Sequence, residues 1–127
     1  MEIKLGILIK SRNALEKLNN TEGIDAITAY RISKNIKEIG KELSIYDEQH
    51  LKLLNTYCEK NNGKPILEDG MVKVIGENFK KYESELSKIF DENVDVSIKK
   101  ISLESILNAL LSPAQIGSIE YMLETED

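Results

Sequence analysis

The sequence predicts an α+β fold that is mostly helical and built around one long helix. Apolar side chains recur at steps of three and four, without interruption, from Ala29 to Tyr57. Two short stretches instead alternate apolar with polar residues, and 31% of all residues are charged. The three–four spacing is typical of a helical face, alternation indicates a strand, and abundant charge suits helices with solvated outer faces.

The long helix is predicted from residue 26 to about residue 59. Asp25 stands before it as an N-cap, because a carboxylate accepts hydrogen bonds from the free amides of the first helical turn. Such a helix rises roughly 50 Å, which exceeds the diameter of a domain of this length. Gly40 lies inside it, either as a point of close approach for a neighbour or as a surface glycine.

The apolar face of this helix, here called the seam, keeps a heptad spacing for about four repeats, as coiled coils do. A helix this long extends beyond what the rest of a short chain can cover, so we expect a partner, in the first place a second copy. The alternative is an intramolecular bundle that leaves only part of the seam bare. The predicted interface residues are Ile32, Ile36, Ile39, Leu43, Tyr46, His50, Leu53 and Tyr57.

Before the long helix, Ile3 and Leu5 alternate with polar residues and predict a short strand, followed by a helix over residues 7–19. A helix starting at Glu2 is the alternative. The helix over 7–19 would form a helical hairpin with the long helix, since a turn-like segment, NTEG, joins them.

The second half of the chain is predicted to complete a single domain, residues 1–127. Asp-Gly between two apolar runs indicates a β-hairpin, and Ser112-Pro113 is a typical helix start. The predicted elements are a hairpin at about 65–75, a helix at 77–91 packed along the long helix, a strand at 94–98, and short helices at 102–110 and 113–123.

Charge and composition restrict the class of partner. The net charge of −5 and the interleaving of lysines with acids argue against binding to duplex nucleic acid, which needs a basic stripe. The single cysteine, Cys58, fits a reducing compartment and a buried apolar role, and no apolar run is long enough for a membrane helix. We expect a soluble, intracellular protein.

Catalytic and metal-binding patterns do not emerge from the sequence. His50 is the only histidine, and it falls on the seam, where a core histidine with one hydrogen bond is the simplest interpretation. The chain has no G-x-S-x-G elbow and no glycine-rich phosphate loop. We therefore predict neither an enzyme nor a bound metal or cofactor.

The two arginines are the candidates for binding a small anionic ligand, because a guanidinium pairs well with phosphate or carboxylate. Arg12 and Arg31 can both lie near the turn between the first helix and the long helix. Two surface ion pairs would explain them equally well.

The chain resembles a group of small uncharacterised proteins of tailed bacteriophages and prophages of Gram-positive bacteria. The resemblance rests on MEIKLG at 1–6, AYRISKNIKEIGKEL at 29–43, ENVDVSIKKISLESI at 92–106 and LSPAQIGSIEYMLE at 111–124. It implies a small helical protein without catalytic chemistry, a virion component or assembly factor, located in the cytoplasm of the host cell or in the virion. Together with the seam, it leads us to expect a non-enzymatic interaction or assembly protein that acts as a homo-oligomer through the long helix, with a phage or host protein as a further partner. The alternative that it implies is an anti-defence protein that binds a host immune effector or sequesters a nucleotide-derived signal.

Overall fold

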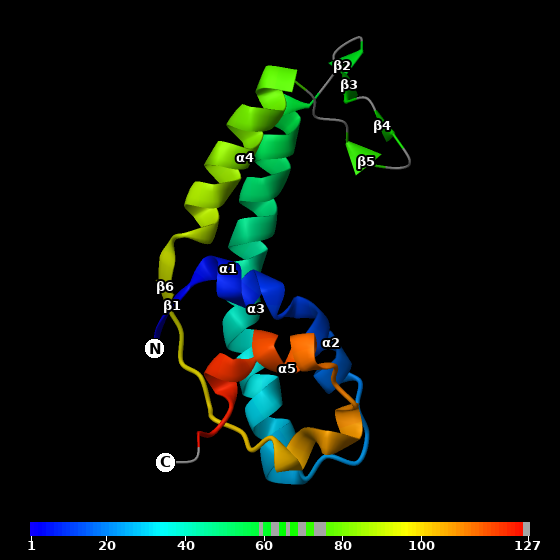
Figure 1. Cartoon of the computed structure of the whole chain (residues 1–127), viewed down its shortest axis with the longest axis vertical. Coiled ribbons are helices and arrows are strands. Elements are labelled where there is room, and N and C mark those ends of the chain that lie inside the picture. The colour runs from blue at the N-terminus through cyan, green and yellow to red at the C-terminus, as the bar shows by residue number, and fades with distance from the viewer. Residues whose placement is uncertain (59, 62–63, 66, 69–70, 73–75, 126–127) are drawn as a thin grey trace.

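The computed structural model describes residues 1–58, 60–61, 64–65, 67–68, 71–72 and 76–125. The molecule is elongated, and helix α3 (Ala26–Tyr57) runs along most of its length (Figure 1). Helix α4 (Gly76–Phe90) lies antiparallel beside the second half of α3, and short elements gather around the first half. The predicted fold class, mostly helical α+β with a helix packed along the long one, is confirmed.

Helix α3 begins where the sequence predicts. The Asp25 side chain accepts a hydrogen bond from the backbone N–H of Thr28 at 3.1 Å, and the bonds from Thr28 hold the pKa of this carboxyl below its ordinary value. The helix ends at Tyr57 because Cys58 adopts an extended conformation, with ψ of 154°. Cys58 is buried, as expected for a small apolar residue. Glu59, the predicted last residue, lies outside the described part of the chain.

Gly40 is a surface glycine of α3, because a Cβ built on it meets no atom within 4 Å. We predict that Gly40→Ala raises the free energy of unfolding by about 0.5–1 kcal/mol, since alanine restricts the unfolded chain more. Urea denaturation measures the change. Gly6→Ala is the contrasting variant and should destabilise the fold, because the added Cβ would lie 3.1 Å from the Phe90 carbonyl oxygen. A loss of stability in Gly40→Ala would contradict the prediction.

The chain begins with a strand, β1 (Glu2–Lys4), and not with a helix. It pairs antiparallel with β6 (Asn93–Asp95), and Ile3 lies opposite Val94. Two helices follow, α1 (Leu5–Lys10) and α2 (Arg12–Asn19), so the prediction of one helix over 7–19 is corrected.

The break between α1 and α2 falls at Ser11, which is fully buried. Its hydroxyl lies 2.7 Å from the Leu8 carbonyl oxygen and 2.9 Å from the Tyr121 hydroxyl. A serine hydroxyl that binds a carbonyl of the preceding turn competes with the helical bonding pattern and bends the helix. The short helices therefore turn around the first half of α3.

The hairpin region is described only in part. Strand β2 (Lys60–Asn61) pairs with β3 (Lys64–Pro65), and β4 (Leu67–Glu68) pairs with β5 (Met71–Val72), in both cases antiparallel. The pairing of β4 with β5 agrees with the predicted hairpin. Its predicted turn at 69–70 and its last residues, 73–75, lie outside the described residues.

The C-terminal part differs from the two predicted helices in type. A 3₁₀ helix, η1 (Glu104–Ala109), replaces the helix at 102–110, and the second helix divides into α5 (Pro113–Ser118) and the 3₁₀ turn η2 (Glu120–Met122). The start of α5 follows the prediction, since Ser112 and Gln115 form a reciprocal capping box with bonds of 2.9 and 3.1 Å.

Leu110 ends η1 in the left-handed conformation, with φ of 52° and ψ of 47°. Among the described residues it is the one non-glycine residue with positive φ. This conformation costs about 1–2 kcal/mol for a residue with a Cβ, which is why glycine or asparagine usually occupies it.

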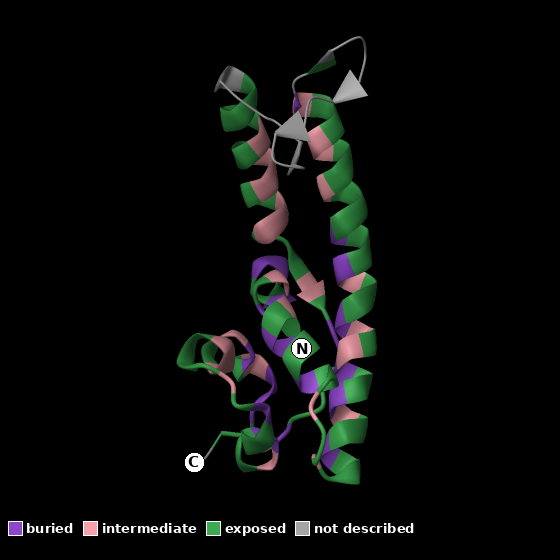
Figure 2. Cartoon of the chain, turned by 90° about the vertical axis from the view of Figure 1, so that its right-hand side faces the viewer, coloured by how far each residue is buried: buried purple, intermediate pink, exposed green. Residues whose placement is uncertain are grey.

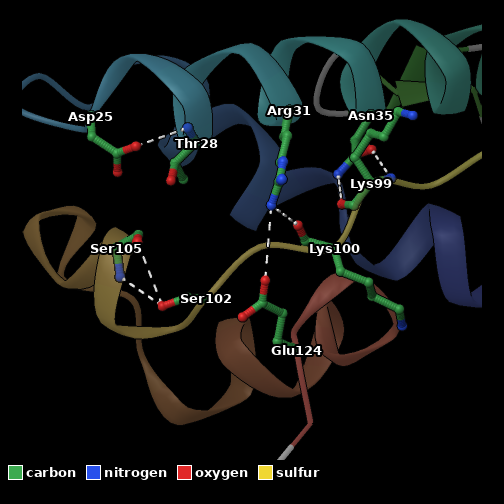
Figure 3. A network of polar contacts seen from close by, with 9 residues as sticks. All are labelled: Asp25, Thr28, Arg31, Asn35, Lys99, Lys100, Ser102, Ser105 and Glu124. Carbon is green, nitrogen blue, oxygen red and sulfur yellow. Dashed lines mark hydrogen bonds and ion pairs between the residues drawn. The ribbon is translucent and has the colours of Figure 1, made fainter.

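Between β6 and η1 the chain runs extended beside α3, where Asn35 holds it (Figure 3). The Asn35 amide nitrogen donates to the Lys99 carbonyl oxygen at 2.8 Å, and its side-chain oxygen accepts from the Lys99 backbone N–H at 2.7 Å. The side chain of Asn35 is fully buried. A backbone bridge from Ile101 to Leu123 then attaches the C-terminal segment to the same extended stretch.

The hydrophobic core surrounds the first half of α3, where Figure 2 shows most of the buried residues. The end of the α3–α4 pair next to the β2–β5 segment, residues 50–57 of α3 and 78–82 of α4, is half-buried or exposed and is here called the distal hairpin. Large apolar side chains that the core buries completely are Leu8, Ile39, Ile101, Ile106, Ile119 and Met122.

Candidate oligomerisation interface

The predicted interface divides into two parts along α3. The seam residues from Ile32 to Tyr46 are buried inside the chain's own core, apart from half-buried Ile36. This arrangement is the intramolecular bundle, the alternative that the sequence analysis gave to a partner. A partner therefore cannot contact these residues unless the core opens. The buried set is Ile32, Ile39, Leu43 and Tyr46, and the half-buried set of the distal hairpin is His50, Leu53 and Tyr57.

A row of aromatic rings joins α3 to α4 at the base of the distal hairpin. The His50 ring stacks on Tyr46, with centroids 5.4 Å apart, and on Tyr82, at 5.9 Å. Phe90 and Phe79 extend the row at its two ends. Burial raises the pKa of both tyrosine hydroxyls, so the phenols stay protonated at neutral pH.

His50 has the hydrogen bond expected of a histidine in a core. Its Nε2 lies 2.5 Å from the Tyr82 hydroxyl, and its ring stacks against the rings of Tyr46 and Tyr82. Within the described part of the chain, no group of three histidine, cysteine or acidic side chains is placed to bind a metal ion. The geometry of His50 therefore supports a packing role between the two helices.

The distal hairpin exposes apolar side chains beside the seam. Leu51 of α3 is 57% exposed and Phe79 of α4 is 43% exposed. Leu54 is half-buried and lies three residues after Leu51, on the same flank of the helix. These three residues are here called the distal surface, and they are the part of the helical hairpin that remains open to a partner.

The two arginines do not come together, which corrects the expectation that they share a ligand site. Arg12 forms an ion pair with Asp47 at 2.7 Å and lies 6.0 Å from the centre of the Tyr46 ring. Arg31 donates to the Lys100 carbonyl oxygen at 3.1 Å and faces Glu124 at 3.8 Å (Figure 3). Each guanidinium binds groups of its own chain, as the ion-pair interpretation predicted. Asp47, the partner of Arg12, lies several turns along α3 from Arg31.

A cavity of about 680 Å³ lies between α1 and the α5–η2 segment. Ile7, Lys10 and Tyr121 contribute to its walls. The Tyr121 hydroxyl bonds to Ser11, and burial raises its pKa to about 12, so it supplies no base at neutral pH. Ser118 and Glu120 also line the cavity, and the Ser118 hydroxyl donates to the Gln115 carbonyl oxygen at 2.6 Å.

No family model, curated protein or solved structure matches the chain. No helix among the described residues is long and apolar enough to cross a membrane. The functional proposal therefore depends on the residues and the geometry described above.

Sequence reasoning missed two features that the structure places in prominent positions. Asn35 follows Ile32 by three residues and precedes Ile39 by four, so the sequence puts a polar side chain at a core position. A polar side chain at a core position needs a hydrogen-bond partner, so Asn35 was the sequence signal for this buried hydrogen bond. Leu103, Leu107 and Leu110 share the apolar pattern of a short helix, yet the structure exposes all three.

Proposed function

We propose that the protein is a non-enzymatic, phage-type interaction or assembly protein that works as a homo-oligomer through its distal hairpin. The single observation that supports this proposal is the distal surface, where Leu51, Leu54 and Phe79 extend the half-buried seam into solvent. The resemblance to phage proteins supports the biological setting.

Two packed helices cannot enclose a hydrophobic core by themselves, because each leaves the flanks of its apolar stripe open to water. In the first half of α3, helices α1 and α2 provide the missing cover. At the distal hairpin, a second hairpin can provide it and complete a four-helix bundle. Tyr57 and Leu53 would then become fully buried.

The test replaces the distal surface with charge in the double variant Leu51→Glu, Phe79→Glu. Its association constant should fall at least ten-fold, and its average mass in solution should fall, because the contact would bury two carboxylates. Light scattering after size exclusion measures the mass across a concentration series. Both residues are well exposed, so circular dichroism should show an unchanged helix content.

The matched control is Ile45→Glu, since Ile45 is also 57% exposed on α3 but precedes Leu51 by six residues and faces another side. It should associate like the wild type. Equal masses for the wild type and the double variant over the whole series would overturn the proposal.

A further inference from the structure

A second apolar surface lies on the C-terminal part, around η1, at the other end of α3 from the distal hairpin (Figure 1). Leu103, Leu107 and Leu110 are 41%, 62% and 80% exposed. Together they form a patch here called the leucine patch. Singly exposed apolar residues are ordinary, but a contiguous group marks an interaction site.

Leu110 is unusual in both its backbone and its side chain. The left-handed turn is firmly held, because the Leu110 N–H donates to the Leu107 carbonyl oxygen at 3.1 Å and its own carbonyl accepts from Lys17 Nζ at 2.9 Å. The strained conformation projects a leucine that is four-fifths exposed. The chain's own core gains little from this side chain, so a contact outside the core is the remaining source of stabilisation.

Beside the projecting side chain, the patch is hollowed. An apolar cavity of about 230 Å³ is lined by Leu103, Ile106, Leu107, Leu110, Leu111 and Ile116. An apolar cavity of roughly 150 Å³ already accepts a molecule the size of benzene, so this one accommodates a leucine side chain. The same patch therefore contains both a projection and a matching recess.

We propose that the leucine patch is an interface with a second copy of this chain, in which Leu110 of each copy enters the cavity of the other. A two-fold symmetric contact requires a surface that is complementary to itself, and a projection next to a recess meets that requirement. Glu104 and Lys17 border the patch with opposite charges, so the symmetric contact brings together no excess of one sign.

The patch consists of three exposed leucines and the walls of one cavity, whereas a standard interface buries roughly 800 Å² on each partner, so we expect a weak, concentration-dependent contact. It is separate from the distal hairpin. Two different symmetric contacts at opposite ends of an elongated molecule would join copies into an open chain.

The decisive variant is Leu110→Gly, measured by sedimentation equilibrium up to millimolar concentration. Glycine adopts positive φ without strain, so the thermal midpoint of the variant should be unchanged or raised by up to about 5 °C. The association constant for the contact through the leucine patch should fall at least ten-fold. Leu110→Asn also tolerates this backbone and should behave in the same way. Ile45→Ala, outside both surfaces, is the control.

Combining variants separates this proposal from the distal interface. With both contacts present, Leu110→Gly should leave a dimer joined by distal hairpins, and Leu51→Glu with Phe79→Glu should leave a dimer joined by leucine patches. The combined variant should be a monomer. Unchanged association in both Leu110 variants would overturn the leucine-patch proposal whatever the distal variants show.

Discussion

Replacing Asn35 with alanine is expected to lower the free energy of unfolding by about 2–4 kcal/mol. The Asn35 amide satisfies both the N–H and the carbonyl oxygen of Lys99, at 2.7 and 2.8 Å. Each buried polar group left without a partner costs roughly 1–3 kcal/mol. Urea denaturation at neutral pH, followed by circular dichroism, measures the change.

The control is Asn55→Ala, which removes an exposed asparagine from the same helix and should change stability by less than about 0.5 kcal/mol. Asn35→Asp separates hydrogen bonding from packing, because it keeps the size of the side chain and the acceptor for the Lys99 N–H. Its carboxylate would face the Lys99 carbonyl oxygen, so the folded state should disfavour ionisation. The loss of stability should therefore be larger at pH 7 than at pH 4. Equal unfolding midpoints for Asn35→Ala and Asn55→Ala would contradict the prediction.

The features that were predictable from the sequence depend on local signals. Asp25 and Ser112 are N-caps because short-range bonds to the first turn decide where a helix begins. The seam spacing likewise predicted the long helix to within two residues at its end. Such signals involve residues within one or two turns, so one sequence contains all the information they need.

The features that were not predictable depend on contacts between distant parts of the chain. The Ser11 hydroxyl at the bend also binds the hydroxyl of Tyr121, 110 residues later, and the two arginines pair with Asp47 and Glu124 at different levels of α3. The burial of Ile32, Ile39, Leu43 and Tyr46 inside the chain's own core was not predictable for a related reason. Spacing shows that one face of a helix is buried, but it does not show whether the chain itself or a partner covers that face.

Ile39→Ala is expected to lower the free energy of unfolding by about 3–4 kcal/mol, because Ile39 is buried within the chain's own core. Ile39 lies at the centre of the seam and is completely buried. Large-to-small changes of this kind cost roughly 2–5 kcal/mol through lost burial and the cavity left behind. Ile45→Ala is the matched control, because it makes the same chemical change at an exposed position of the same helix, where alanine's helix propensity makes it neutral or slightly stabilising.

Protein concentration then distinguishes the two possible roles of this part of the seam. If Ile39 belongs to the core of one chain, the loss of stability is the same at micromolar and at hundred-fold higher concentration, and the mass of the folded variant equals that of the wild type. An interface residue would behave differently, because mass action makes the stability of an oligomer depend on concentration. If the loss of stability instead becomes smaller as the protein concentration rises, and the variant has a lower mass than the wild type, Ile39 belongs to an intermolecular interface. That result would show that the packing around α3 opens to admit a partner.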